Sequence, residues 1–301
     1  MVTDRVRVLV GDARDRLSDL EAGSVQTVVT SPPYWGLRDY GVAGQLGLEA
    51  TPAAYVEGLV ALFEQVRRVL RKDGTLWVNL GDTYARSRHG NTGLTSGLKN
   101  RRRYEEISLG GALGHRKDQG MPRKALLGMP WRFALAMADA GWRLRADIIW
   151  HKPNPVPESV LDRPTRAHEY VFLFSRQRHY HYDADAIRTP AKAPPRGVVT
   201  LRTATANARS VWTIPTEPYD GPHHAAFPRE LARRCIVAGS RPGDLVLDPF
   251  AGTGTTLEVA LRHGRRAVGV ELSPTYAELI ESRLSGLQLP LDLAGKGSRS
   301  T

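Results

Sequence analysis

Two short stretches decide the fold: VQTVVTSPPYW at residues 25–35 and LVLDPFAGTGTT at residues 245–256. Each begins as an apolar run rich in β-branched residues, which is typical of a buried strand. Each then breaks into a turn-forming sequence, rich in proline in the first stretch and in glycine in the second. Both are therefore predicted to be a strand that runs straight into a turn.

The rest of the chain alternates strand and helix patterns around these two stretches. Strands are predicted at 5–10, 24–29, 75–80, 142–151, 169–174, 245–247 and 266–271, and helices at 13–21, 52–71, 130–140, 227–238, 255–263 and 275–285. Such alternation indicates a doubly wound, mostly parallel α/β sheet. We expect one catalytic domain at 1–285, followed by a flexible tail at 286–301.

The 301-residue chain has a net charge of +11, and this charge is unevenly distributed. The segment 83–125 is rich in Gly, Arg and Ser, and residues 86–124 alone carry +7. This segment lacks apolar periodicity, so we expect a long basic loop that engages a polyanion such as DNA. A solvated basic face is the alternative. The proline-rich segment 176–222 is also predicted to be irregular.

The cysteine count and the apolar runs of the sequence exclude several classes of protein. Cys235 is the single cysteine, which excludes a disulfide framework and a cysteine-rich metal site, and no metal is expected. No apolar run approaches the roughly 20 residues needed to cross a bilayer. The N-terminus has no apolar signal core. We expect a cytoplasmic protein with no membrane partner.

The turn Ser31-Pro32-Pro33-Tyr34 is suited to a planar group that carries an amine. Pro32 and Pro33 fix φ and remove two backbone donors, so the Ser31 hydroxyl and the Pro32 carbonyl remain as acceptors. Tyr34 adds a flat face for stacking. Cytosine and adenine both offer such a group, and the turn alone does not choose between them. A structural Pro-Pro loop is the alternative.

The DPFAGTGTT loop (248–256) lies between a predicted strand and a predicted helix. Its glycines let the backbone approach a ligand, and the helix N-terminus favours an anionic group. Glu271 ends the next strand, where a carboxylate can bind ribose hydroxyls. No lysine follows GTGTT, which excludes a P-loop. The loop and Glu271 together predict a nucleoside-cofactor site.

Together, TSPPYW and DPFAGTGTT resemble the motifs of the S-adenosylmethionine-dependent DNA amino-methyltransferases, which methylate the exocyclic amine of cytosine or adenine. The order of the motifs, with SPPY first, resembles the permuted β-class. The resemblance covers roughly residues 1–85 and 125–285. It implies S-adenosyl-L-methionine as the cofactor, double-stranded DNA as the substrate and a target base that leaves the duplex.

The resemblance also implies site residues. Ser31, Pro32, Pro33 and Tyr34 would hold the target base. The cofactor site would comprise Asp12, Phe227, Asp248, Phe250, Gly252, Gly254 and Glu271. DNA contacts are expected from Arg86, Arg88, Lys99, Arg101, Arg102, Arg103 and Lys152. Asn154, Arg163 and Glu169 are either functional or brace a loop. Segment 176–222 is placed like the target-recognition region of the β-class.

Ser31, where an aspartate can stand, resembles the cytosine-N4 enzymes more than the adenine-N6 enzymes, which remain the alternative. Ring-carbon methylation of cytosine requires a cysteine beside a proline, and Cys235 follows Arg234 instead. RNA and protein-glutamine methyltransferases usually carry an NPPY turn after the cofactor loop, which is the reverse order. A non-catalytic DNA-binding protein is a remoter alternative. We expect a monomer or homodimer that acts alone or beside a cognate restriction endonuclease.

Overall fold

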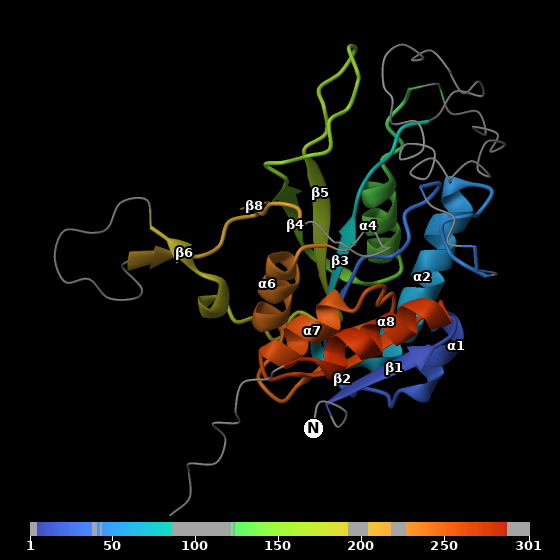
Figure 1. Cartoon of the computed structure of the whole chain (residues 1–301). Coiled ribbons are helices and arrows are strands. Elements are labelled where there is room, and N and C mark those ends of the chain that lie inside the picture. The colour runs from blue at the N-terminus through green and yellow to red at the C-terminus, as the bar shows by residue number, and fades with distance from the viewer. Residues whose placement is uncertain are drawn as a thin grey trace, which may run out of the picture.

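The computed structural model describes residues 5–37, 41–42, 44–85, 122, 124–191, 204–217 and 227–287. Its centre is an eight-stranded sheet in the order β1-β10-β9-β2-β3-β5-β4-β8 (Figure 1). Five of the seven neighbouring strand pairs are parallel, and β5 is antiparallel to both β3 and β4. The prediction of a doubly wound, mostly parallel α/β sheet is confirmed.

The elements follow the predicted order closely. The strands of the sheet are β1 (Val6–Val10), β2 (Val25–Thr30), β3 (Leu70–Leu80), β4 (Arg143–His151), β5 (His168–Ser175), β8 (Val211–Thr213), β9 (Leu245–Asp248) and β10 (Arg266–Glu271). The α-helices are α1 (Ala13–Arg16), α2 (Pro52–Val69), α4 (Met129–Asp139), α6 (Arg229–Gly239), α7 (Thr255–Arg262) and α8 (Pro274–Ser285). Among the described residues, no helix combines the length and apolar character needed to cross a bilayer.

Two boundaries differ from the prediction by more than two residues. The helix expected at 13–21 is one α-helical turn followed by a 3-10 turn at Leu17–Asp19, and β3 begins at Leu70 rather than Thr75. Local patterns define the ends of elements less sharply than their centres.

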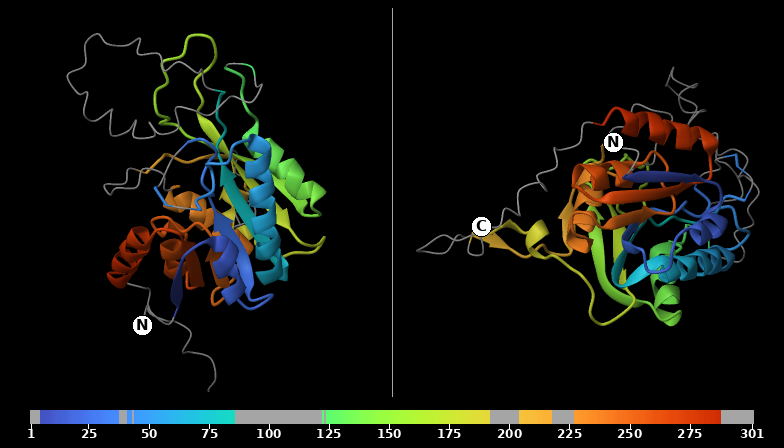
Figure 2. Two further views of the ribbon diagram at one scale, coloured as in Figure 1. Left: turned by 90° about the vertical axis from the view of Figure 1, so that its right-hand side faces the viewer. Right: turned by 90° about the horizontal axis from the view of Figure 1, so that it is seen from below.

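The side chains of the central strands divide the core into two layers. On β3, Leu76 and Val78 pack in the layer that contains α1, α2 and α4, whereas Trp77 packs with α6, α7 and α8. On β2, Val28 and Val29 divide in the same way. Figure 2 shows the two helical layers on opposite sides of the sheet. Burial on both faces explains why these strands are continuous apolar runs in the sequence.

The prediction that segment 176–222 is irregular was wrong in part. Val211–Thr213 forms β8 and extends the sheet parallel to β4. Ile149 N donates to Ser210 O at 2.8 Å, and Trp150 Nε1 donates to Ile214 O at 2.8 Å. A strand of three residues is too short to show a period in the sequence. Two further strands, β6 (Thr189–Pro190) and β7 (Thr205–Ala206), pair apart from the main sheet.

The winding of the sheet reverses between β9 and β2. After β9 the chain continues to β10, on the β1 side, and after β2 it continues to β3, on the other side (Figure 1). Ligands of open α/β sheets bind outside the carboxyl ends of the strands at such a reversal. The proline turn follows β2 and the glycine loop follows β9, so the topology places both motifs at this point.

Gly239, at the end of α6, has no room for a side chain. A Cβ there would lie 2.6 Å from both Thr27 Oγ1 and Thr75 Oγ1 of the sheet. Gly239→Ala should therefore lower the free energy of unfolding by about 1–3 kcal/mol, measured by urea denaturation. Gly286→Ala is the matched control, because no atom lies within 4 Å of its Cβ position and its φ is −82°. Equal stability of the two variants would contradict this packing argument.

Candidate active site

Asp248, the last residue of β9, joins the two sequence motifs. Its Oδ1 accepts hydrogen bonds from Thr30 Oγ1 at 2.6 Å and from Phe250 N at 3.0 Å. Its Oδ2 accepts from Thr256 Oγ1 at 2.7 Å. Thr30 precedes the proline turn, and Thr256 lies in the first turn of α7. The buried carboxylate therefore ties the proline turn to the glycine loop.

This arrangement refines the predicted role of Asp248. The side chain is only 2% exposed, and burial raises its pKa to about 6. Both carboxylate oxygens are engaged within the protein. The side chain therefore holds the loop in place, and a direct contact with the cofactor stays a prediction.

Asp12 and Glu271 stand side by side at the next two strand ends. Val10 pairs in register with Glu271, and Gly11 N donates to Glu271 O at 2.9 Å. The Glu271 carboxylate accepts from Gly252 N and from Ser273 N, each at 2.8 Å. Burial raises the pKa of Glu271. The structure thus brings three predicted cofactor residues, Asp12, Gly252 and Glu271, to one edge of the sheet.

Asp12 caps α1 and forms an ion pair with Arg14. Its Oδ1 accepts from Arg14 N at 2.9 Å, and the Arg14 guanidinium also donates to Gly44 O at 2.8 Å. The hydrogen bond with the Arg14 side chain lowers the pKa of Asp12, so the carboxylate stays ionised at neutral pH. Asp12 therefore places an ionised carboxylate, paired with Arg14, at the same end of the sheet as the glycine loop.

The glycine loop requires two left-handed backbone positions. Gly252 has φ +53° and Gly254 has φ +79°, which other residues rarely adopt. A Cβ on Gly254 would lie 3.0 Å from Ile280 Cγ2 of α8. Phe250 packs partly against the core, and Phe227, just before α6, packs against the layer that contains α7. The loop is compact, and its bare backbone leads into the N-terminus of α7.

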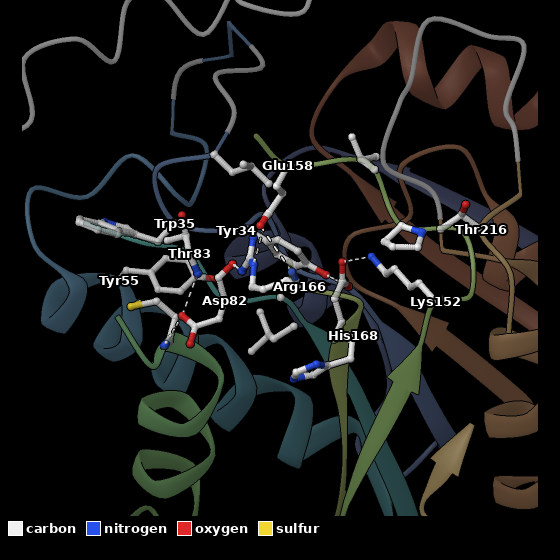
Figure 3. Close-up of a pocket in the computed structure, with 17 residues that line it drawn as sticks. Tyr34, Trp35, Tyr55, Asp82, Thr83, Lys152, Glu158, Arg166, His168 and Thr216 are labelled. Atoms are coloured by element: carbon white, nitrogen blue, oxygen red, sulfur yellow. Dashed lines mark hydrogen bonds and ion pairs between the residues drawn. The ribbon is translucent and has the colours of Figure 1, made fainter. Parts of the chain in front are cut away.

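A pocket lies at the carboxyl ends of β3 and β4 and the amino end of β5 (Figure 3). Within it, Tyr34 Oη donates to Glu169 Oε2 at 2.7 Å, and Asn79 Nδ2 donates to the same oxygen at 3.1 Å. Lys152 forms an ion pair with Glu169 Oε1. Ser31 Oγ lies 3.4 Å from Tyr34 Oη. A polar network therefore connects the Ser31 turn to an ion pair between β5 and the residue after β4.

Burial and the neighbouring Glu169 carboxylate raise the pKa of Tyr34, so its hydroxyl stays protonated. Because a carboxylate can only accept, the Tyr34 proton is directed at Glu169. The Tyr34 oxygen is then an acceptor for the Ser31 hydroxyl. This sequence of donors and acceptors leaves the lone pairs of Ser31 Oγ, next to the pocket-lining Tyr34, available to a further donor.

Neighbouring elements hold the proline turn in place. Tyr55 Oη of α2 donates to Pro33 O at 2.8 Å. A Cβ on Gly81, just after β3, would lie 2.8 Å from Tyr34 Cε2 and 3.2 Å from Glu169 Cδ. A Cβ on Gly47 would lie 3.0 Å from Tyr34 O. The Tyr34 ring fits because residue 81 has no side chain, and the Tyr34 backbone fits because residue 47 has none.

The predicted DNA contacts fall into two groups. Arg86, Arg88, Lys99, Arg101, Arg102 and Arg103 lie outside the described residues. Lys152 is described, and its ammonium pairs with Glu169 and lies 4.3 Å from the centroid of the Trp150 ring. It lines the pocket, and a contact to DNA stays a prediction. Asn154 accepts from Thr216 N at 3.0 Å and Arg163 binds Glu158, so both brace a loop.

Sequence analysis missed two residues of this region. Asn79 contributes to the pocket network, and its signal was an amide inside the apolar run TLWVNL, where strand propensity disfavours it. Asp82 accepts from Gly128 N and Met129 N, each at 3.0 Å, and so caps α4. Because 46 or 47 residues separate these partners, no local pattern could have shown that contact.

Comparison with known proteins identifies the family. The family model described as DNA methylase, for N6 and N4 methyltransferases, matches residues 25–282. The chain belongs to this family. The methylase is 48% identical over 280 residues to the Type II methyltransferase M.SmaI of Serratia marcescens, covering 92% of this chain and 90% of the relative. It is also 48% identical over 278 residues to M.XycI of Xanthomonas campestris pv. cyanopsidis, covering 92% and 86%.

Solved structures show the same fold. A candidate DNA modification methylase from Thermus thermophilus, in complex with S-adenosyl-L-methionine, is 29% identical, with a TM-score of 0.60 and coverage of 94% of this chain and 96% of that one. The PvuII DNA methyltransferase, which is cytosine-N4-specific, is 21% identical, with a TM-score of 0.66 and coverage of 96% and 88%. At 21% identity this second likeness concerns the fold alone.

The methylase is an S-adenosyl-L-methionine-dependent DNA methyltransferase. The residues at the carboxyl ends of the adjacent strands β1, β10 and β9 fit this cofactor. Two carboxylates suit the hydroxyls of a ribose and the positive charge of a sulfonium. The left-handed φ of Gly252 and Gly254 shapes the loop that leads its bare backbone into the N-terminus of α7. Cys235 is buried within α6, away from the proline turn, and burial raises the pKa of its thiol.

Asp248→Asn tests the buried carboxylate that links the proline turn to the glycine loop. The quantity measured is the pH dependence of the free energy of unfolding. The folded-state pKa of Asp248, about 6, exceeds the unfolded value of about 3.9. Its contribution to stability is therefore fully present below about pH 4 and is lost as the pH rises through about 6. Asparagine has no such proton, so the variant should gain stability relative to the wild type between about pH 4 and 7, by up to about 3 kcal/mol.

Urea denaturation across this pH range measures the difference in the free energy of unfolding. The matched control is Asp139→Asn, at an exposed aspartate of α4. If the difference in the free energy of unfolding between Asp248→Asn and wild type does not change with pH, Asp248 does not titrate as a buried carboxylate with a raised pKa.

Proposed function

We propose that the methylase modifies the exocyclic N4 amine of a cytosine that has left double-stranded DNA and entered the Tyr34 pocket. The observation that carries the proposal is a chain of polar contacts that runs from Lys152 through Glu169 and Tyr34 to Ser31. Lys152 pairs with Glu169, Glu169 accepts from Tyr34, and the Tyr34 oxygen faces Ser31 at 3.4 Å. The Ser31 oxygen is thereby prepared as an acceptor, and an exocyclic amine is a donor.

The chemistry needs such acceptors because the lone pair of an exocyclic amine is delocalised into the ring. Acceptors for its N–H bonds favour a pyramidal nitrogen and stabilise the positive charge that develops on it. Each well-placed group of this kind is worth roughly 3–4 kcal/mol. The Ser31 hydroxyl and the Pro32 carbonyl would supply them. S-adenosyl-L-methionine supplies, when bound, a methyl group on a positively charged sulfur.

The chain also positions the base. The Tyr34 ring offers a stacking face, and stacking offsets part of the cost of taking a base from the duplex. The Asp248 joint keeps the proline turn and the glycine loop in a fixed relation, so the acceptors and the cofactor site are held as one unit. Preorganisation of this kind avoids the cost of arranging the groups during the reaction.

Ser31 favours cytosine over adenine. A neutral hydroxyl at this position resembles the cytosine-N4 enzymes, and adenine N6 is the alternative. The Type II names of the relatives support a role in restriction–modification beside a cognate endonuclease. Segments 83–125 and 176–222 remain the candidates for DNA engagement and target recognition, in a protein that acts as a monomer or homodimer.

Sequencing of modified DNA tests which base is methylated. Expression in a bacterial host without DNA modification should give N4-methylcytosine within one short motif. Single-molecule sequencing locates the motif, and mass spectrometry of digested DNA identifies the base. A host that expresses Ser31→Ala is the control. N6-methyladenine would overturn the choice of cytosine, and unmodified DNA would overturn the proposed reaction itself.

Ser31→Ala should lower the single-turnover rate by about 10²–10³-fold, because it removes one acceptor of the amine. The affinity for S-adenosyl-L-methionine, measured by calorimetry, should stay the same. Ser31 follows β2, whereas the predicted cofactor residues follow β1, β9 and β10. Tyr34→Phe keeps the ring and removes the hydroxyl that orients Ser31, so its loss should be smaller. A wild-type rate in Ser31→Ala would show that Ser31 does not bind the reacting amine.

A further inference from the structure

The loop that joins β4 and β5, residues 152–167, extends beyond the edge of the sheet (Figures 1 and 2). Its first half lines the base pocket through Pro155, Val156 and Glu158. It therefore stands where a duplex must approach if a base is to enter this pocket. We call residues 152–167 the pocket loop.

Several contacts brace the pocket loop. At its base, Lys152 N donates to Ala167 O at 2.7 Å. Across it, Arg163 Nη1 donates to Glu158 Oε2 at 2.6 Å, and the Arg163 guanidinium carbon lies 3.8 Å from the centroid of the Tyr84 ring. Arg166 also donates to the Asp82 carbonyl. A loop with this many polar contacts holds a defined shape.

The braced loop nevertheless presents apolar side chains to solvent. Leu161 is 105% exposed and Val156 is 83% exposed, whereas no other large apolar side chain within the described ranges exceeds 59%. Single exposed apolar residues are common on proteins. The unusual feature is their position, since both occur on one braced loop that forms a wall of the base pocket.

The surroundings of the pocket loop favour a nucleic acid as the partner. Lys124 pairs with Asp162 at 2.5 Å, and Lys124 N donates to Ala85 O at 3.1 Å. Ala85 and Lys124, the described residues that bound the segment 86–124 with its net charge of +7, therefore lie together, and Lys124 contacts this loop. Such a charge attracts the phosphates of DNA, and a duplex so held lies next to Leu161.

We propose that Leu161 is a wedge that enters the base stack of the duplex when the target base leaves it. This inference rests on the proposed function, because only a base that leaves the duplex creates the gap. The departing base leaves an unpaired partner and two unstacked neighbours. Apolar side chains inserted at such a step cover the exposed base faces and keep the duplex open. Val156, on the pocket side of the loop, covers the entrance.

The test compares a matched duplex with one in which the target base is already unpaired. Both carry the motif identified by sequencing, and the second has an abasic site opposite the target base. In the second duplex extrusion costs little, so a wedge contributes little. Leu161→Ala should therefore reduce the ratio of the single-turnover rates, matched to unpaired, by about tenfold or more.

Leu135→Ala is the matched control, because Leu135 is an exposed leucine of α4 outside the pocket. It should leave the ratio unchanged. Leu161→Phe, which keeps an apolar wedge, should retain at least half of the wild-type ratio. An unchanged ratio in Leu161→Ala overturns the proposal, whether both rates are unaffected or both fall equally. A change of oligomeric state in Leu161→Ala, seen by sedimentation, also overturns it, because a second copy of the chain would then cover the loop.

These outcomes separate the wedge from the proposed function. If wild-type protein methylates neither duplex, the proposed function fails. If wild-type protein is active and the ratio in Leu161→Ala equals that of the wild type, the reaction stands and the wedge alone is overturned.

Discussion

The active site depends on one buried carboxylate. Asp248 accepts hydrogen bonds from Thr30 and Thr256, which lie at the entrances of the two functional turns. Thr30 and Asp248 are 218 residues apart in the chain. Burying a carboxylate is costly unless its oxygens are satisfied, and three donors satisfy this one. The result is that the proline turn and the glycine loop are two ends of a single hydrogen-bonded unit.

The base pocket depends on the one strand that runs against the others. In a parallel sheet only the carboxyl ends of strands reach the ligand edge. Because β5 is antiparallel to β3 and β4, it brings its first residues to that edge instead. Glu169 thereby meets Asn79 of β3 and Lys152, which follows β4. A largely buried ion pair adds little net stability. Its position beside Tyr34 makes this part of the pocket polar.

Much of the fold and part of the site could be predicted from the sequence, because their signals are local. The apolar runs at 25–30 and 245–248 predicted the strands β2 and β9, and Gly252 and Gly254 predicted the loop after β9. The remainder depends on contacts between distant segments. The pairing of Lys152 with Glu169 needs the turn of the pocket loop, and β8 exists only because β4 offers an open edge. Hydrophobic periodicity and short sequence motifs are local, so they do not indicate contacts between distant segments.

The position of β9 and β10 has a consequence for how the protein is made. These strands are synthesised near the end of the chain, yet they lie between β1 and β2, which are made first. While the chain emerges from the ribosome, β1 and β2 have no shared partner, and their edges stay open until residue 271 is available. Closing such long loops makes assembly slow relative to local folding. A nascent chain therefore has neither a cofactor loop nor the carboxylate that joins it to the base turn. Methylating activity therefore arises only after the chain through β10, which ends at Glu271, has been synthesised.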